Sequence, residues 1–397
     1  MKLLHTSDWH LGQSFKNRSR QKEHQMFLEW LLQTIQKEHI ELLIVAGDIF
    51  DTTNPPNYAL KLYHNFLSKV KEYCQNVIII AGNHDSITTL EISKELLEAF
   101  SIFVITDGKE KTIIPIKKEN KLQALVCAVP FLRDKILRDA NKAQTTSQIE
   151  NDIKTGIQNY YQEIYQQAKE ISSSVPIIAT GHFTTTNASI TPDSEREIYI
   201  GKLQAVDSDI LKHFDYVAMG HIHKPQLIAN QQHIRYSGSP IPLSFSEANQ
   251  QKSVVIADLL QKTYTPYPIP SFKKLYHLKG DLESIQEQLT PLYDTTNPPF
   301  IAITTTQQNL SYEEMNQFMN TNNKNGVDIV LFQRDIQLKE NLLEEESITL
   351  QELTPLDVFE KRIQNEPLDD TTKEQLTHLY KQIMTKCENE PPITENF

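Results

Sequence analysis

Short apolar runs separated by amphipathic segments dominate the first 260 residues. Each run has four or five apolar residues in succession, which is typical of strands buried on both faces. The runs are Leu42–Ala46, Val77–Ala81, Leu125–Ala128, Ile177–Thr180 and Tyr216–Met219. Apolar residues at helical spacing predict helices over Gln21–His39, Ala59–Cys74, Thr89–Phe100 and Gln148–Ile171. This alternation predicts an α/β layered fold.

The pattern changes after residue 260. Thr263–Pro270 has prolines at positions 266, 268 and 270 and is predicted to be a rigid linker. Beyond it, the predicted strands Lys274–Lys279, Phe300–Thr305 and Val327–Phe332 alternate with helical segments, so we expect a small α+β domain that ends near residue 338. Two amphipathic helices are predicted within 345–390, and their apolar faces either pack on the body or bind a partner. The predicted division is 1–268, 269–338 and 345–390.

Composition narrows the class of protein. The 397 residues are 39% apolar and 23% charged, which allows large cores. The formal charge of −12 argues against a chain that coats DNA by overall basicity, but it leaves a local DNA contact open. Three scattered cysteines (Cys74, Cys127 and Cys387) indicate neither a disulfide framework nor a zinc ribbon. With no apolar run near ~20 residues and no signal peptide, we expect a cytoplasmic protein without a membrane span.

Five polar clusters directly follow predicted strands. They are Asp8-Trp9-His10, Gly47-Asp48-Ile49-Phe50-Asp51, Gly82-Asn83-His84-Asp85, Gly181-His182 and Gly220-His221-Ile222-His223. Ligands collect at the carboxyl ends of strands in an open α/β sheet, so we expect these clusters to converge on one edge. The Asp-x-His and His-x-His spacings predict both side chains on one side of an extended segment.

The side chains in these clusters suit metal ions. Two acids, one amide and four imidazoles form a mixed oxygen and nitrogen set that fits two divalent transition ions, manganese first or iron. Asp48 is the natural bridge, since a carboxylate can span two ions about 3.5–4 Å apart. Each residue alone is also typical of an ordinary turn or cap. The occurrence of all five clusters together favours a metal site.

The five clusters occur in the order found in the calcineurin-like metallophosphoesterase superfamily, which the chain resembles. The resemblance implies that Asp8, His10, Asp48 and His223 hold one ion. It implies that Asp48, Asn83, His182 and His221 hold the second. His84 is then a catalytic residue that faces the scissile phosphate, and Asp51 orients it as a carboxylate–histidine pair.

Longer segments resemble the nuclease subunits of bacterial SbcCD complexes, relatives of the double-strand-break repair nucleases. They include HTSDWHLGQ at 5–13, VAGDIFDTTNPP at 45–56, MGHIHKPQ at 219–226 and YSGSPIPLSF at 236–245. The resemblance implies manganese-dependent 3′–5′ exonuclease activity on duplex DNA and endonuclease activity on single strands and hairpins, in DNA repair, recombination and replication. It further implies that the domain at 269–338 is a capping domain and that the C-terminal helices bind an SbcC-like SMC-family ATPase partner. A homodimer formed by helices at 59–71 or 89–100 is also implied.

Alternatives remain open at this point. One is a phosphomonoesterase or cyclic-nucleotide phosphodiesterase on the same fold, and another is a catalytically silent scaffold that recruits an ATPase. Several cations near the motifs are candidates for DNA backbone contacts or are simply solvated surface charges: Lys16, Arg18, Arg20, Arg133, Lys135 and Lys224.

Overall fold

The computed structural model describes residues 1–137, 146–189, 205–307, 309–335 and a few positions between 363 and 380. The chain divides into two compact units, 1–335 and 336–397. Most of the two helices predicted within 345–390 lie outside the described residues. The architecture below is that of the first unit. No described helix is both long enough and apolar enough to cross a membrane.

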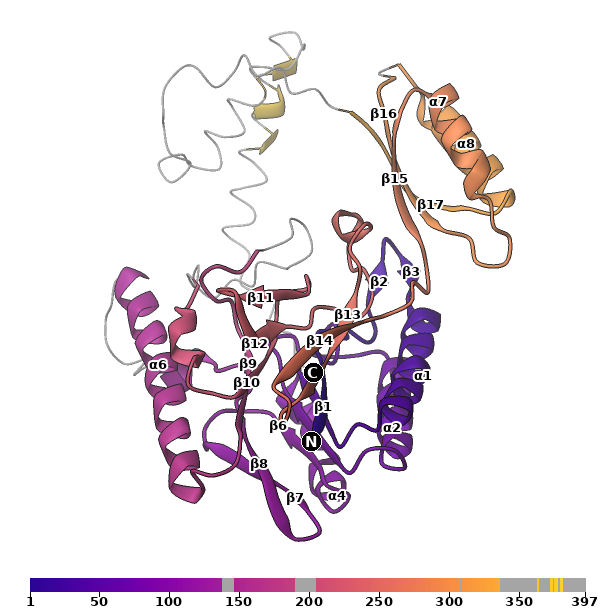
Figure 1. The fold of residues 1–397 in the computed structure, drawn as a ribbon. Coiled ribbons are helices and arrows are strands. Elements are labelled where there is room, and N and C mark those ends of the chain that lie inside the picture. Colours follow the sequence, from indigo (N-terminus) through magenta and orange to yellow (C-terminus); the bar gives the residue numbers. More distant parts are fainter. Residues whose placement is uncertain are drawn as a thin grey trace. The chain divides into compact units, whose positions relative to one another are not determined.

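Two six-stranded sheets form the body of this unit (Figure 1). The first has the order β14 (Thr263–Pro268), β13 (Ser253–Asp258), β1 (Lys2–Thr6), β4 (Leu42–Ala46), β5 (Asn76–Ile80), β6 (Ile102–Ile105). The second has the order β11 (Gln226–Ile228), β12 (Gln231–Tyr236), β10 (Tyr216–Gly220), β9 (Ile177–His182), β8 (Lys121–Ala128), β7 (Thr112–Lys118). The central strands are parallel in both sheets. All five predicted strands are confirmed.

The two sheets pack face to face, and helices cover their outer faces. Apolar side chains from both sheets, including Ile44, Ile78 and Ile178, form one buried core between them. Helices α1 (Gln21–Glu38) and α2 (Asn57–Val70) cover the first sheet, and α6 (Thr146–Ile171) covers the second (Figure 1). Every residue of β4 is buried because this strand is covered on both sides. The α/β layered prediction is therefore confirmed, although the layers number four.

Two sequence predictions for this body were wrong. Thr263–Pro270 is not a linker, since its first six residues form β14 and pair with β13 along their whole length. β14 lies at the edge of the sheet, where proline is tolerated because one side of the strand needs no ladder hydrogen bonds. The single helix predicted over Thr89–Phe100 is divided into α3 (Ile87–Glu91) and α4 (Lys94–Glu98), because Ser93 between them leaves the helical conformation.

A smaller sheet follows the body. Its three parallel strands are β15 (Leu275–Gly280), β16 (Phe300–Thr305) and β17 (Asp328–Arg334), in that order. The connections contain α7 (Leu282–Leu289) and α8 (Tyr312–Lys324). A reciprocal Ser311–Glu314 capping box starts α8. All three strands predicted for this region are confirmed.

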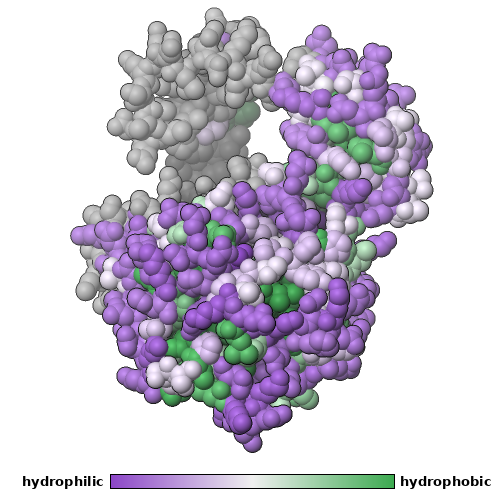
Figure 2. Space-filling view, viewed as in Figure 1, coloured by the Kyte–Doolittle hydropathy of each residue, from purple (hydrophilic) through white to green (hydrophobic). Residues whose placement is uncertain are grey.

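Short elements complete the unit. They are β2 (Ser14–Phe15), β3 (Arg18–Ser19), α5 (Asp134–Leu137) and the 3-10 helices Ser208–Leu211, Phe245–Glu247 and Thr290–Leu292. Figure 2 shows a face on which hydrophilic residues dominate and hydrophobic residues occur in separate patches. Most large apolar side chains are accordingly found in the buried cores.

Candidate metal centre

All seven predicted ligands converge at one end of the body. Asp8 and His10 follow β1, Asp48 follows β4 and Asn83 follows β5, all in the first sheet. The histidines at 182, 221 and 223 lie at or just after the ends of β9 and β10, in the second sheet. The expectation of a single sheet edge was therefore wrong, because two facing sheets contribute. The site opens into a cavity of about 760 Å³, lined in part by the residues at 10, 48, 83, 84, 221 and 223.

One cluster joins Asp8, His10 and His223. The Nε2 atoms of His10 and His223 lie 3.2 Å apart, and His10 Nε2 lies 3.7 Å from Asp48 Oδ2. Ligand atoms about 2.1 Å from one ion are about 3.0–3.4 Å apart at octahedral or tetrahedral angles. The closely spaced imidazole nitrogens therefore fit the first coordination sphere of a divalent ion.

A second cluster joins Asp48, His182 and His221. Asn83 Oδ1 lies 2.9 Å from His182 Nε2 and 3.0 Å from His221 Nδ1. Asp48 Oδ2 lies 3.2 Å from His182 Nε2, in addition to its approach to His10. Asp48 thus stands between the clusters, which is the position that a bridging carboxylate needs.

The backbone at these residues is unusual. Asp8, His10, Asp48 and His221 have φ values of 52°, 46°, 49° and 96°. The extended conformation expected for the Asp-x-His and His-x-His spacings is therefore wrong. Main-chain bonds hold the left-handed residues in place: Asp8 N donates to Gly47 O and His10 N to Asp48 O, both at 3.0 Å. Such strained positions persist where the surrounding structure enforces them, often at functional sites.

Two glycines allow the sheets to meet at the site. A Cβ atom on Gly220 would lie 1.8 Å from the carbonyl oxygen of Ala46 in the other sheet. A Cβ atom on Gly47, where φ is 87°, would lie 2.2 Å from His182 Nδ1. That nitrogen instead contacts Ala46 O at 2.9 Å, which fixes the ring and leaves Nε2 for a ligand role.

Burial and charge set the protonation of the second cluster. Burial opposes ionisation of Asp48, but the neighbouring His182 and His10 hold the pKa of its carboxyl well below the usual range. Burial would lower the pKa of His182, but Asp48 raises it to about 9. Burial and His182 together lower the pKa of His221 to about 3. Because ligating imidazoles are neutral, an ion bound here would displace the proton on His182.

His84 lies on the cavity wall, but Asp51 orients it in an unexpected way. His84 Nδ1 lies 2.8 Å from the backbone oxygen of Asp51, not from its carboxylate. The Asp51 carboxylate instead approaches His10 Nδ1 at 3.3 Å. The Asp51 carboxylate also belongs to one group with His10 and His84, so the carboxylate–histidine pair with His84 stays a prediction. The contact with the Asp51 carbonyl orients His84 and leaves Nε2 for the cavity.

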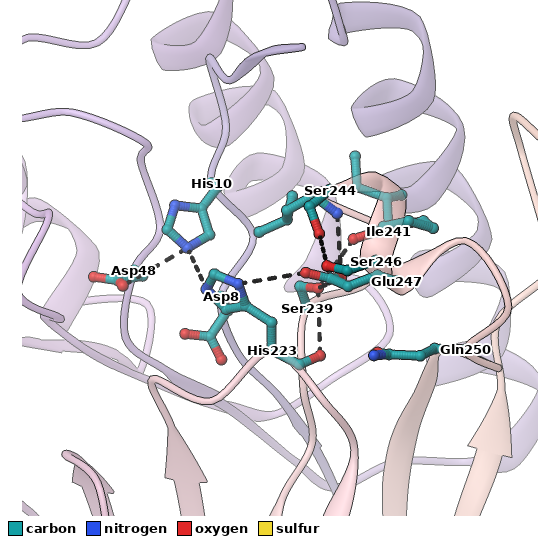
Figure 3. A network of polar contacts seen from close by, with 12 residues as sticks. Asp8, His10, Asp48, His223, Ser239, Ile241, Ser244, Ser246, Glu247 and Gln250 are labelled. Atoms are coloured by element: carbon teal, nitrogen blue, oxygen red, sulfur yellow. Dashed lines mark hydrogen bonds and ion pairs between the residues drawn. The ribbon is translucent and has the colours of Figure 1, made fainter. Parts of the chain in front are cut away.

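Sequence reasoning gave no role to two buried carboxylates at the site. Asp85 accepts from the backbone nitrogens of Phe50 (2.9 Å), Ile49 (3.1 Å) and Gly82 (2.8 Å), so it joins the second and third motif loops. In the sequence, the only indication of a role for Asp85 was its position directly after Asn83-His84. Glu247 faces His223, with Oε1 3.7 Å from Nδ1 (Figure 3). In the sequence, the only indication of a role for Glu247 was its position just after the segment 236–245.

The cations that are candidates for DNA contacts differ in their burial and in their partners. Arg20 is 1% exposed and donates to Pro242 O, with its guanidinium over the Phe15 ring. Its role as a DNA contact is therefore wrong, since a buried side chain cannot reach a phosphate backbone. Arg18 is paired with Asp328 at 3.0 Å, whereas Lys16 is exposed and lines the cavity. The side chain of Lys135 lies outside the described residues.

Comparison with known proteins gives the class first. A family model described as calcineurin-like phosphoesterase matches residues 1–225, which is more than half of the chain. A second model, described as the type 5 capsule protein repressor C-terminal domain, matches residues 271–366. The protein is a calcineurin-like phosphoesterase, a class that works with divalent metal ions.

The relatives give the family. The chain is 36% identical over 389 residues to the SbcD subunit of nuclease SbcCD from Escherichia coli K12, covering 96% of this chain and 97% of the relative. It is 30% identical over 308 residues to the corresponding protein of Staphylococcus epidermidis, covering 75% and 77%. It is 33% identical over 267 residues to that of Bacillus subtilis, covering 65% and 66%. The chain belongs to the SbcD family, the nuclease subunits of SbcCD complexes.

Proposed function

We propose that this chain hydrolyses phosphodiester bonds of DNA at the cavity, with two divalent ions held by the seven predicted ligands. The observation that carries the proposal is the pair of ligand clusters that meet at Asp48, with His84 on the same cavity wall. The relatives of this chain are named as nuclease subunits, which supports a nucleic-acid substrate over a small phosphomonoester.

In this proposal each cluster binds one ion. Asp8, His10 and His223 hold the first, Asn83, His182 and His221 hold the second, and Asp48 is shared. When bound, the ions supply positive charge that stabilises the phosphate in the transition state and favours ionisation of water. The nitrogen-rich donor set supports Mn²⁺ over Mg²⁺, which prefers oxygen ligands.

His84 acts on the substrate rather than on the ions. Its Nδ1 is engaged by the Asp51 carbonyl, so Nε2 is the atom that can donate to the phosphate or to the leaving sugar oxygen. The His84 backbone nitrogen donates to Asp48 Oδ1 at 2.9 Å, which ties its position to the shared carboxylate. A positioned acid of this kind contributes about 10²–10⁴-fold to rate.

The cavity offers surface for a longer substrate than one phosphate. Beyond the metal cluster it is lined by Lys16 and by four residues of the small sheet, namely His277, Ala302, Leu331 and Gln333. His277 Nε2 and Gln333 Nε2 lie 2.9 and 3.3 Å from Thr304 Oγ1, so this wall is polar and ordered by side-chain hydrogen bonds. We propose that DNA passes between this wall and the metal cluster, whether cleaved as an exonuclease or an endonuclease substrate.

Partners and organisation follow from the family. We propose binding of an SbcC-like SMC-family ATPase through the helices predicted within 345–390, in the cytoplasm and on the nucleoid. We also propose a homodimer through the helix at 59–71 or the segment 89–100, in which Ile92, Leu96 and Phe100 are 80%, 65% and 51% exposed. The division at 268/269 and 338 stays a proposal, which the second family match from residue 271 supports. The stacked rings of Phe15 and Phe300 join the first two parts.

The test is cleavage by the purified chain of end-labelled linear duplex, hairpin and single-stranded DNA. Mn²⁺, Mg²⁺ and a chelator are compared, with SbcC and ATP added in a parallel series and a chromogenic monoester as the competing substrate. We expect Mn²⁺-dependent cutting of DNA that the chelator abolishes. Faster turnover of the monoester than of DNA would instead indicate a phosphomonoesterase. Absence of all hydrolysis, with the ATPase present, would indicate a silent scaffold.

A further inference from the structure

A buried ion pair formed by Glu247 and Lys252 lies beside His223, outside the set of predicted ligands. Glu247 is 0% exposed and Lys252 is 4% exposed. Burying two charges costs desolvation energy, and apolar residues in their place are often equally or more stabilising. A purely stabilising role therefore explains this pair poorly, and its neighbours point to another.

Both members of the pair contact His223. Lys252 Nζ donates to the carbonyl oxygen of His223 at 2.9 Å and to Glu247 Oε2. The other carboxylate oxygen of Glu247, Oε1, lies 3.7 Å from His223 Nδ1. Neither Oε1 nor Nδ1 has a hydrogen-bond partner within the part of the chain that the structure describes. Two buried polar atoms thus face each other.

The chemistry of imidazole determines which ring nitrogen of His223 carries the proton in this contact. His223 Nε2 faces His10 Nε2 at 3.2 Å, so it is the atom available to a metal ion. A ligating Nε2 needs a free lone pair, which places the ring proton on Nδ1. A carboxylate opposite Nδ1 favours that tautomer and fixes the ring plane. A hydrogen bond there needs a separation of about 2.7–3.2 Å, so Nδ1 and Oε1, which are 3.7 Å apart, have to move closer when it forms.

Glu247 is itself held from three sides. Besides Lys252, its Oε2 accepts from the backbone nitrogen of Leu243 at 3.2 Å and from Ser239 Oγ at 3.4 Å. Lys252 also donates to Ser239 Oγ at 3.0 Å. These contacts leave Oε1 as the oxygen directed at His223, as the close-up in Figure 3 displays.

We propose that Glu247 is a positioning residue that accepts a hydrogen bond from the Nδ1–H group of His223 and so directs Nε2 toward the ion bound with Asp8 and His10. Lys252 fixes both the carboxylate of Glu247 and the main chain of His223. The inference rests on the proposed role of His223 as a ligand. It assigns to the segment between β12 and β13 a part in metal binding, although that segment contains none of the predicted ligands.

The first test is a calorimetric titration of the full chain with Mn²⁺. We expect two ions per wild-type chain, and for Glu247→Gln a roughly 10–100-fold weaker binding of one ion with the other unchanged. Because Glu247→Gln leaves the buried Lys252 without its carboxylate, the same titration is made on Glu247→Gln/Lys252→Met. Glu23→Gln is the control, since Glu23 is also buried and paired with a cation, Arg20.

A double-mutant cycle shows whether the effect passes through His223. In a His223→Ala background, Glu247→Gln is expected to have no further effect on Mn²⁺ affinity. Nitrogen-15 spectra of the histidines should show the Nδ1–H tautomer of His223 in the wild type and its loss in Glu247→Gln. Unchanged Mn²⁺ affinity in both Glu247 variants overturns the inference, as does an equal loss in Glu23→Gln. Binding of fewer than two ions by the wild type contradicts the proposed function instead.

Discussion

The two sheets contribute to the metal centre in different ways. On the first sheet, Asp8, His10 and Asp48 lie in loops with left-handed backbone that is held by main-chain hydrogen bonds between loops. On the second sheet, His182 is part of a regular strand, and its ring is fixed by a carbonyl of the opposite sheet. The half of the candidate metal centre on the first sheet therefore depends on hydrogen bonds between its loops. The half on the second sheet depends on how the two sheets pack together.

The difference predicts separate defects in chemistry and in metal binding. His84→Ala on the first half should lower the rate of DNA cleavage by about 10²–10⁴-fold and leave two Mn²⁺ ions bound, because His84 is not among the predicted ligands. His221→Ala on the second half should instead lose one ion. Cleavage kinetics and metal analysis measure both. His213→Ala, an exposed histidine outside the cavity lining, is the control. Loss of metal in His84→Ala would contradict its assignment.

A methyl group at the contact between the sheets tests the second half. Gly220→Ala places Cβ against the Ala46 carbonyl, which cannot move without displacing β4. We expect a loss of about 1–3 kcal/mol in the free energy of unfolding and weaker Mn²⁺ binding. Gly108→Ala is the control, because its closest neighbour is the flexible end of Leu132. Denaturant unfolding and Mn²⁺ titration give the result, and equal behaviour of the two variants would argue against close sheet packing at the site.

Removal of one buried acceptor tests the first half. Asp85→Asn keeps the size of the side chain but offers one carbonyl oxygen where two carboxylate oxygens accept three backbone N–H groups. Leaving a buried donor unpaired costs about 1–3 kcal/mol, and the loops that carry Asp48 and Asn83 should loosen. Chemical denaturation and hydrogen exchange of these loops measure the effect. Asp215→Asn is the comparison, since the carboxylate of Asp215 accepts from one backbone nitrogen, that of Ile177 in the second sheet.

The smallest effect on stability is expected for a substitution outside both halves of the candidate metal centre. Arg18 and Asp328 form an ion pair whose side chains are 47% and 25% exposed. Exposed pairs contribute less than about 1 kcal/mol, so Arg18→Ala should change the free energy of unfolding by less than that. DNA affinity measured in the same variant shows whether Arg18 contacts the substrate. A stability loss as large as that of Gly220→Ala would mean that the pair holds the small sheet in place.

The sequence was most informative where local pattern decides structure. Continuous apolar runs predicted β4, β5, β8, β9 and β10, and the polar residues at the ends of β4, β5, β9 and β10 are five of the seven predicted ligands. The linker prediction failed because proline is compatible with an edge strand, and no local pattern distinguishes the two. The arrangement in two sheets, the burial of Arg20 and the contact between Glu247 and His223 depend on residues far apart in the chain. Such long-range packing leaves little trace in one sequence.

The central claim is that two facing sheets build one two-ion site around Asp48. Anomalous X-ray scattering at the manganese edge, from crystals of the full chain soaked in Mn²⁺, tests this most directly. We predict two peaks per chain, one beside His10 and His223 and the other beside His182 and His221, with Asp48 in contact with both. A single peak, or peaks that Asp48 does not touch, would contradict the account.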